Sequence, residues 1–323
     1  MLGGAIRRAP RPGFWEGRNP LSLRLGMIDF DTSHAFEFAA RLNHRGISED
    51  QWVDGAEVVV GCPGKSIIFP ERIPTETEKI KKLDFPLVES AEEMLAHKID
   101  AVLIEGNGGD QHLDRAFFFL SKKIPAFVDK PFACKFDDAR KMFDLADKAG
   151  VPLMSSSSLR YAPEVKAWKE KFQASSSSAS APPLLGAITF GPGSQHPLNP
   201  GLFNYGIHAV EMLFALLGKG CESVACSSSK HADMTTGIWD SGQIGSIRTD
   251  RPGGAYGFVT FTDRVEHVPV STAYIYRELL KEIVGMFQTG KSPIEPAETI
   301  ELIRFIEQAN ASAANHGIPH PIA

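Results

Sequence analysis

The sequence predicts an α/β protein in which a doubly wound parallel sheet is followed by an α+β domain with a mixed or antiparallel sheet that is open on one face. Three observations support this fold class. Buried strands alternate with amphipathic helices roughly every 20–30 residues up to residue 155, which is typical of a parallel sheet covered on both faces. A run rich in serine and proline follows at residues 174–183. Beyond it, residues 221–270 have the pattern of strands joined by turns.

The chain is organised around residues 23–43, where a buried strand runs directly into a helix. The strand is expected at residues 23–30, and apolar residues then recur at i, i+3, i+4 and i+7 from Ala35 to Leu42. Three polar residues could cap this helix: Asp31, Thr32 and Ser33. Doubly wound folds bind the phosphates of a nucleotide at such a turn, but the glycines that normally form it are missing here.

Further strands and helices complete the predicted parallel sheet. The strands are expected at residues 56–62, 99–104, 124–129 and 151–154. One helix begins at Ser90, which forms a capping box with Glu93. Another has an inward face made of Leu113, Ala116, Phe117 and Leu120, and a third runs from Asp137 to Gly150. Residues 63–86 contain four prolines and are expected to be irregular. The strands should end at one edge of the sheet, at Phe30, Cys62, Gly106, Asp129 and Lys130.

The second half of the chain has a different pattern. Its helices are expected at residues 163–172, 205–217, 276–288 and 296–315, and its strands include residues 185–190 and a hairpin within residues 253–270. We therefore divide the chain into a disordered leader (1–20), a nucleotide-binding type of domain (21–155) and an α+β domain for substrate and oligomer contacts (156–323).

Composition excludes several functional classes. A net charge of −5 gives no general attraction to nucleic acid or to an anionic membrane, and no apolar run is long enough to span a bilayer. The four cysteines form no C-x-x-C pair, which favours reduced thiols in a cytoplasmic protein. No residues lie at a recognised metal-ligand spacing, so no metal site is expected. A small-molecule ligand is the remaining expectation.

Lys130 is the first candidate for chemistry. It follows a buried strand and precedes Pro131, which biases it toward an extended conformation at the mouth of the sheet. A lysine held there could hydrogen-bond or protonate a substrate oxygen. The alternative is an ordinary surface lysine after a strand.

His208 is the second candidate. Asn204, His208 and Glu211 fall at i, i+4 and i+7 and should share one face of a helix. An amide and a carboxylate beside a histidine could fix its tautomer and let it act as an acid or base. The alternative is a polar helix face with a solvated histidine.

Several motifs occur in an order that resembles one family. The runs are IDAVLI at residues 99–104 with His112 in the next helix, FVDKPFA at 127–133, LRYAP at 159–163 and the helical ending at 276–322. This order is similar to the Gfo/Idh/MocA (glucose-fructose oxidoreductase-like) family of NAD(P)-dependent dehydrogenases, with Asp129 in place of the glutamate of its Glu-Lys-Pro motif. The resemblance covers nearly the whole chain from residue 21 and implies a Rossmann domain.

The resemblance also implies site residues and partners. Lys130 and His208 would surround the reacting carbon, and Asn204 would orient His208 from the position of the family's aspartate, making it a weaker base. The residues implied to contact NAD or NADP are Gly26, Phe30, Asp31, Thr32, Ser33, His34, Cys62, Lys65, Gly106, Asn107, His112, Asp129 and Lys130. Those implied to contact substrate are Arg160, Tyr161, Tyr205 and Glu211. A homodimer or homotetramer formed through the second sheet is expected.

The nucleotide turn departs from the family pattern, since its three glycines correspond to Asp29, Asp31 and His34. Two carboxylates beside a pyrophosphate would weaken binding by repulsion. Lys65 would tolerate a 2′-phosphate, which favours NADP over NAD. The most direct interpretation is an oxidoreductase that transfers hydride to or from a sugar, polyol or related hydroxy compound. The alternatives are a non-catalytic carbohydrate-binding or scaffolding relative and a NAD-assisted lyase or glycosidase.

Overall fold

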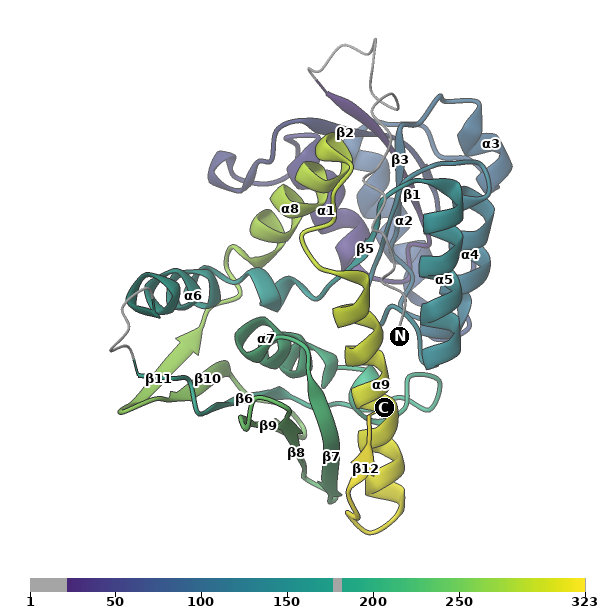
Figure 1. The fold of residues 1–323 in the computed structure, drawn as a ribbon. Coiled ribbons are helices and arrows are strands. Elements are labelled where there is room, and N and C mark those ends of the chain that lie inside the picture. The colour runs from purple at the N-terminus through teal and green to yellow at the C-terminus, as the bar shows by residue number, and fades with distance from the viewer. Residues whose placement is uncertain (1–21, 177–181, 323) are drawn as a thin grey trace, which may run out of the picture.

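A computed structural model describes residues 22–176 and 182–322 of the chain. Two sheets dominate it, a parallel one in the N-terminal half and a mixed one in the C-terminal half (Figure 1). The predicted fold class is confirmed. The leader expected at residues 1–20 lies outside the described residues, and the domain boundaries stay a prediction. Over the described ranges, no helix combines the length and the apolar character needed to cross a membrane.

The first sheet has five parallel strands in the order β2-β1-β3-β4-β5. They are β1 (Leu23–Ile28), β2 (Ala56–Cys62), β3 (Ala101–Ile104), β4 (Ala126–Val128) and β5 (Leu153–Ser155). The helices of this half are α1 (Ser33–Leu42), α2 (Arg72–Ile80), α3 (Ala91–Leu95), α4 (His112–Leu120) and α5 (Phe136–Ala149). One face of the sheet packs on α4 and α5, and the other packs on α1 together with α8 (Ile275–Thr289) from the second half (Figure 1). Both faces are thus covered, as a parallel sheet requires.

The second sheet has seven strands in the order β11-β10-β6-β9-β8-β7-β12, and only β6 and β9 pair in parallel. The strands are β6 (Gly186–Pro192), β7 (Cys221–Ser228), β8 (Ala232–Trp239), β9 (Ile244–Asp250), β10 (Tyr256–Phe261), β11 (Val265–Val270) and β12 (His320–Pro321). The remaining helices are α6 (Pro163–Ser176), α7 (Ile207–Leu217) and α9 (Pro296–Ala314). Helices α7 and α9 cover the inner face of this sheet (Figure 1).

Short 3₁₀ helices join several of these elements: η1 (Glu49–Gln51), η2 (Lys81–Leu83), η3 (Gly109–Gln111), η4 (Ser158–Tyr161) and η5 (Gly201–Phe203).

Helix ends follow the predicted chemistry at four places. Thr32 is the N-cap of α1 and accepts a hydrogen bond from the His34 amide. Ser90 accepts from the Glu93 amide, while the Glu93 side chain accepts from the Glu89 amide and from the Ser90 hydroxyl. Gly150 ends α5 in the left-handed conformation, and Pro296 occupies the first turn of α9.

Three sequence predictions about the elements are wrong. Residues 63–86 contain α2, because Pro74 falls in its first turn, where a missing amide proton costs no hydrogen bond. Phe117 is 55% exposed, and Phe119 takes the inward position on α4. Helix α7 begins at Ile207, so Asn204 precedes it, and ten of its eleven residues are buried, so it has no solvated polar face.

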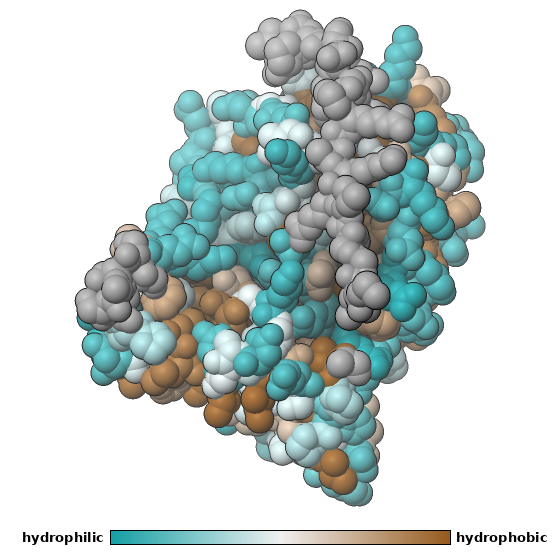
Figure 2. All heavy atoms as spheres, in the orientation of Figure 1, coloured by the Kyte–Doolittle hydropathy of each residue, from teal (hydrophilic) through white to brown (hydrophobic). Residues whose placement is uncertain are grey.

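The outer face of the second sheet carries exposed apolar side chains on β8 and β9. Phe258 and Thr260 point inward, whereas Met234, Ile238 and Ile244 are each more than 40% exposed on the opposite face. Figure 2 shows hydrophobic side chains gathered along the lower left of the molecule, over the region of this sheet.

Candidate functional site

A cavity of about 290 Å³ lies where the carboxyl ends of the parallel strands face α7. Both halves of the chain line it. From the first half come the start of α1, Asn107 after β3 and Lys130 after β4, and from the second half come His208 on α7 and Tyr256 on β10. The carboxyl edge of a parallel sheet is where such folds bind ligands.

The structure brings many of the predicted site residues together on the cavity wall: Thr32, Ser33, His34, Asn107, Lys130, Asn204, Tyr205 and His208. The predicted convergence of Lys130 and His208 is therefore observed. Others lie away from the wall. Gly26 packs against Met94 inside the sheet, Phe30 is fully buried against Gly61, and Cys62 is buried at the end of β2. Lys65 is exposed on the loop that follows.

His112 lies behind the wall, where it holds two loops together. Its Nε2 lies 2.8 Å from the Gly106 carbonyl and its Nδ1 lies 2.9 Å from the Pro131 carbonyl. It is fully buried, so a direct cofactor contact from this side chain has no support. Its effect is to fix the loops that carry Asn107 and Lys130.

Lys130 is held in place by polar neighbours. Its ammonium Nζ lies 3.5 Å from Asp129 Oδ2 and donates to Asn107 Oδ1 at 3.4 Å. Only 11% of its side chain is exposed, so it is not an ordinary surface lysine. It therefore presents one positive charge at the floor of the cavity.

His34 is anchored by Asp129. Its Nδ1 lies 2.7 Å from Asp129 Oδ2, and its ring stacks on Phe38 and meets Tyr276 edge-on. Burial alone would raise the pKa of Asp129, but His34 and Lys130 outweigh that effect and hold it below its usual range. The carboxylate is thus ionised beneath the cavity.

His208 is held by Ser157, and the prediction that Asn204 orients it is wrong. His208 Nδ1 lies 2.6 Å from the Ser157 hydroxyl, whereas Asn204 donates to the carbonyl and hydroxyl of Ser194. Burial lowers the pKa of His208 to about 3, and the charges of Lys130 and His34 add to that shift. The imidazole is neutral at physiological pH. The low pKa makes His208 a weak base. The cause is burial and the nearby positive charges, and not the replacement of an aspartate by Asn204.

Arg160, Tyr161 and Glu211 lie behind the cavity. The Arg160 guanidinium bridges Glu211 and Glu298, and Arg160 and Glu211 are both buried. Burial dominates the raised pKa of Tyr161. None of the three is on the cavity wall, so their predicted substrate contact has no support, and the ion pairs instead tie α7 to α9 and η4. Tyr205 does line the cavity.

The two aspartates of the nucleotide turn point into the protein. Asp29, at φ 70°, forms a bidentate ion pair with Arg115 on α4, at 2.9 and 3.0 Å. Asp31 accepts hydrogen bonds from the Asn107 amide and the Ser66 hydroxyl. The expectation that two free carboxylates repel a phosphate is therefore wrong, because both are buried and engaged elsewhere.

The residues present fit the reactive end of a dinucleotide. The N-terminus of α1, with the Thr32 and Ser33 side chains, offers donors at the cavity, and Asn107 and Lys130 stand opposite. The side of the crevice next to β2 is filled by Asp29, since a Cβ on Gly64 would lie 2.0 Å from its Oδ1. A cofactor would therefore contact side-chain hydroxyls where relatives offer a glycine backbone.

Several residues at the site were not identified from the sequence. Ser157 and Ser158 belong to a run of four serines that begins at the last residue of β5. The Ser158 hydroxyl is buried without a hydrogen-bond partner among the described residues. Arg72 of α2 reaches the same cavity, as do Tyr256 and Tyr276. Only the serine run was visible as a polar signal directly after a buried strand.

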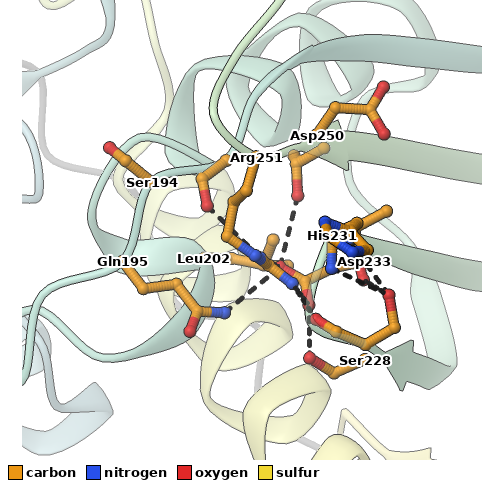
Figure 3. Close-up of polar contacts among 12 residues, drawn as sticks. Ser194, Gln195, Leu202, Ser228, His231, Asp233, Asp250 and Arg251 are labelled. Atoms are coloured by element: carbon orange, nitrogen blue, oxygen red, sulfur yellow. Dashed lines mark hydrogen bonds and ion pairs between the residues drawn. The ribbon is translucent and has the colours of Figure 1, made fainter.

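One rim of the cavity is fastened by a buried ion pair (Figure 3). Arg251, which follows β9, donates to both carboxylate oxygens of Asp233 on β8 and to the Gly193 carbonyl. Gln195 donates to the same carboxylate. These contacts fix the loop at residues 193–195, and the Ser194 carbonyl of this loop accepts a hydrogen bond from Asn204. The Asn204 side of the cavity is thus connected to the second sheet.

The structure is that of a two-sheet α/β protein with a cavity at the carboxyl edge of a Rossmann-type sheet. Residues 65–157 match the family model GFO_IDH_MocA, described as "Oxidoreductase family, NAD-binding Rossmann fold". The predicted resemblance to this family is confirmed. No curated protein matches the sequence.

Three solved structures share the fold across most of the chain. GenD2 from gentamicin A biosynthesis in complex with NAD is 14% identical with a TM-score of 0.76, covering 98% of this chain and 99% of its own. A myo-inositol dehydrogenase from Corynebacterium glutamicum is 14% identical with a TM-score of 0.73, covering 94% and 99%. The WlbA dehydrogenase from Bordetella pertussis, in complex with NADH and UDP-GlcNAcA, is 15% identical with a TM-score of 0.68, covering 93% and 98%.

Proposed function

We propose that the protein is an NAD(P)-dependent oxidoreductase acting on a sugar, a polyol or a related hydroxy compound. The observation that carries the proposal is the meeting of Lys130 and His208 in one cavity at the carboxyl edge of the parallel sheet. The matched oxidoreductase family and the dehydrogenases that share the fold support it. The chain resembles these proteins across both sheets.

The substrate class follows from the wall of the cavity. Its polar groups include hydroxyls and amides from Thr32, Ser33, Asn107, Asn199 and Asn204. The buried Ser158 hydroxyl adds a group that needs a partner. Such a wall suits a ligand with several hydroxyl groups, which can donate and accept in turn.

Each catalytic residue has a distinct part. When bound, the nicotinamide supplies the group that accepts or donates a hydride. Lys130 hydrogen-bonds the oxygen of the reacting carbon and stabilises negative charge on it. His208 contacts the same hydroxyl and takes its proton during oxidation, while Ser157 fixes the imidazole. Because His208 has a low pKa, it releases that proton to solvent water and returns to the neutral form.

The cofactor is held by residues of the first half. We assign the phosphates to the N-terminus of α1 and the nicotinamide end to Asn107 and Lys130. NADP is favoured over NAD because Lys65, exposed on the loop after β2, offers a positive charge to a 2′-phosphate, and residues 62–65 contain no carboxylate to bind a ribose.

Calorimetric titration with NAD⁺, NADH, NADP⁺ and NADPH tests the proposal. Dissociation constants below about 1 mM for at least one of them are expected, with the phosphorylated forms tighter. Lys65→Ala should reduce the difference in affinity between NADP(H) and NAD(H). The matched control is Lys82→Ala, a change at another exposed lysine, which should leave that difference unchanged. Silence across all four nucleotides would favour a non-catalytic carbohydrate-binding relative, for which the missing glycines in the turn at residues 29–34 are the supporting observation.

We further propose a cytoplasmic homodimer or homotetramer built on two structural units, 21–155 and 156–323. The four cysteines are unpaired and buried, which suits a reducing compartment. The apolar outer face of the second sheet would be covered by a second copy.

A further inference from the structure

Directly under the cavity lie two carboxylates that the oxidoreductase proposal does not use fully. Glu105 follows β3 and is 0% exposed, and neither of its oxygens has a hydrogen-bond partner among the described residues. Asp129 Oδ1, after the neighbouring strand β4, is also buried without a partner. His34 and Lys130 compensate Asp129 through its Oδ2, but neither oxygen of Glu105 has a partner of this kind. A buried carboxylate without compensation is strongly unfavourable, so Glu105 requires a positive partner or a proton.

His34 completes a cluster around these carboxylates. One ligand atom from each of His34, Glu105 and Asp129, an imidazole nitrogen or a carboxylate oxygen, lies within 4.8 Å of the other two. The three residues come from the start of α1 and from the ends of two adjacent strands, so the backbone fixes their positions. Imidazole and carboxylate groups are the ligands that first-row divalent metal ions take in proteins.

The spacing within the cluster selects a geometry. Two ligand atoms at about 2.1 Å from an ion lie roughly 3.0 Å apart at a right angle and roughly 3.4 Å apart at the tetrahedral angle. His34 Nδ1 and Asp129 Oδ2 are 2.7 Å apart, close to the right-angle value. A six-coordinate ion is favoured over tetrahedral Zn²⁺, and the imidazole disfavours Mg²⁺ and Ca²⁺, which prefer oxygen ligands.

We propose that His34, Glu105 and Asp129 bind a six-coordinate divalent metal ion, Mn²⁺ or Fe²⁺, at the floor of the cavity. No sequence motif predicts this site, because consecutive ligands are 71 and 24 residues apart along the chain.

The ion would act on ligands in the cavity. Three protein atoms leave coordination positions free, and His34 is both a ligand and part of the cavity wall. A ligand with two adjacent oxygens, such as a vicinal diol or an α-hydroxy carboxylate, can fill two of those positions. Lys130, 3.5 Å from Asp129, would keep the ion's affinity moderate by repulsion.

Metal binding is measured directly, without nucleotide or substrate. The purified full chain is stripped with a chelator and titrated with Mn²⁺ by calorimetry and by electron paramagnetic resonance, in which bound Mn²⁺ loses the signal of the free ion. We expect one Mn²⁺ per chain with a dissociation constant below about 1 mM. Ca²⁺ should compete poorly because it prefers all-oxygen ligands, and Fe²⁺ under anaerobic conditions should compete well.

Matched variants locate the ion. Glu105→Gln should weaken Mn²⁺ binding at least about tenfold, while Glu92→Gln, the same change at an exposed site on α3, should leave it unchanged. Thermal unfolding of both variants confirms that they are folded, and His34→Asn provides a second test if Glu105→Gln is unstable. Absence of Mn²⁺ binding by the folded wild-type chain, or wild-type affinity in both folded ligand variants, would overturn the proposal and leave a proton on Glu105 as the compensation for its burial.

Discussion

Asp29 shows how a single side chain changes the meaning of the nucleotide turn. Its carboxylate neutralises Arg115 and occupies the space between Gly64 and Gly106, so removing it creates an unpaired, half-buried guanidinium. Changing Asp29 and Asp31 to glycine should therefore destabilise the protein.

Asp29→Asn should lower the free energy of unfolding by about 1–3 kcal/mol, because a hydrogen-bonded ion pair is broken and one charged partner remains. Urea unfolding followed by circular dichroism measures it. Asp114→Asn on the exposed side of α4 is the control and should change stability by less than about 0.5 kcal/mol. Equal effects of the two changes would show that the Arg115 pair contributes nothing.

His208 should make the protein sensitive to acid. Its pKa is about 3 in the folded protein and about 6.5 when unfolded, so below pH 6.5 the unfolded state binds the extra proton. Stability therefore falls as the pH drops from about 6.5 toward 3, by up to roughly 1.4 kcal/mol per unit from this group.

Unfolding free energies measured from pH 7 to pH 4 should fall less steeply for His208→Asn than for the wild type. His231→Asn, at an exposed histidine, should keep the wild-type slope. Parallel curves for wild type and His208→Asn would mean that His208 titrates normally in the folded state.

At the scale of elements, the periodic segments were predictable and the turns between them less so. The five parallel strands and helices α1, α4 and α5 follow from apolar repeats and capping residues. Helix α2 was missed because four prolines outweighed a short apolar pattern, although Pro74 lies where proline is tolerated. The start of α7 was placed two residues early, which put Asn204 on the same face as His208.

A site residue could be predicted from the sequence only where it belongs to a local sequence pattern. Lys130 and His208 each follow from a local pattern. Ser157, Arg115 and Glu105 owe their roles to partners 51, 86 and 24 residues away, and such pairs leave no trace in the spacing of one sequence. The inward turn of Asp29 depends on Arg115 in the same way.

Two ion pairs at the end of β9 differ in burial, and their contributions to stability can be compared. Arg251 and Asp233 are largely buried and share two hydrogen bonds (Figure 3). Arg248 and Asp250 are exposed. Arg251→Met should cost about 2–4 kcal/mol, because Asp233 is left buried without its charged partner. Arg248→Met should cost less than about 1 kcal/mol. Urea unfolding and the rate of proteolysis within residues 193–205 measure both, and similar costs would show that burial of the pair is unimportant.

The whole molecule places its cavity between two halves and leaves one sheet face uncovered. Helix α8, from the C-terminal half, packs on the first sheet beside α1, so the two halves are joined on one side while the cavity separates their facing surfaces. On the far side, Ile238 and Ile244 pair across β8 and β9 and are 49% and 54% exposed. Adjacent apolar side chains of this kind favour association, because their exposure to water is unfavourable and a second copy of the chain would bury them.

Ile238→Asp should therefore convert the proposed oligomer to a monomer, because the charge would be buried at the centre of the contact without a partner. Sedimentation velocity at micromolar concentration measures the change. The control is Ile67→Asp, which places the same charge at an isoleucine that is 57% exposed on the first half of the chain and should leave the oligomer intact. The Ile238→Asp variant should remain folded as a monomer, since Ile238 is 49% exposed and makes little contact with the core. A wild-type protein that sediments as a monomer, or an Ile238→Asp variant that stays associated, would show that this sheet face is not the interface.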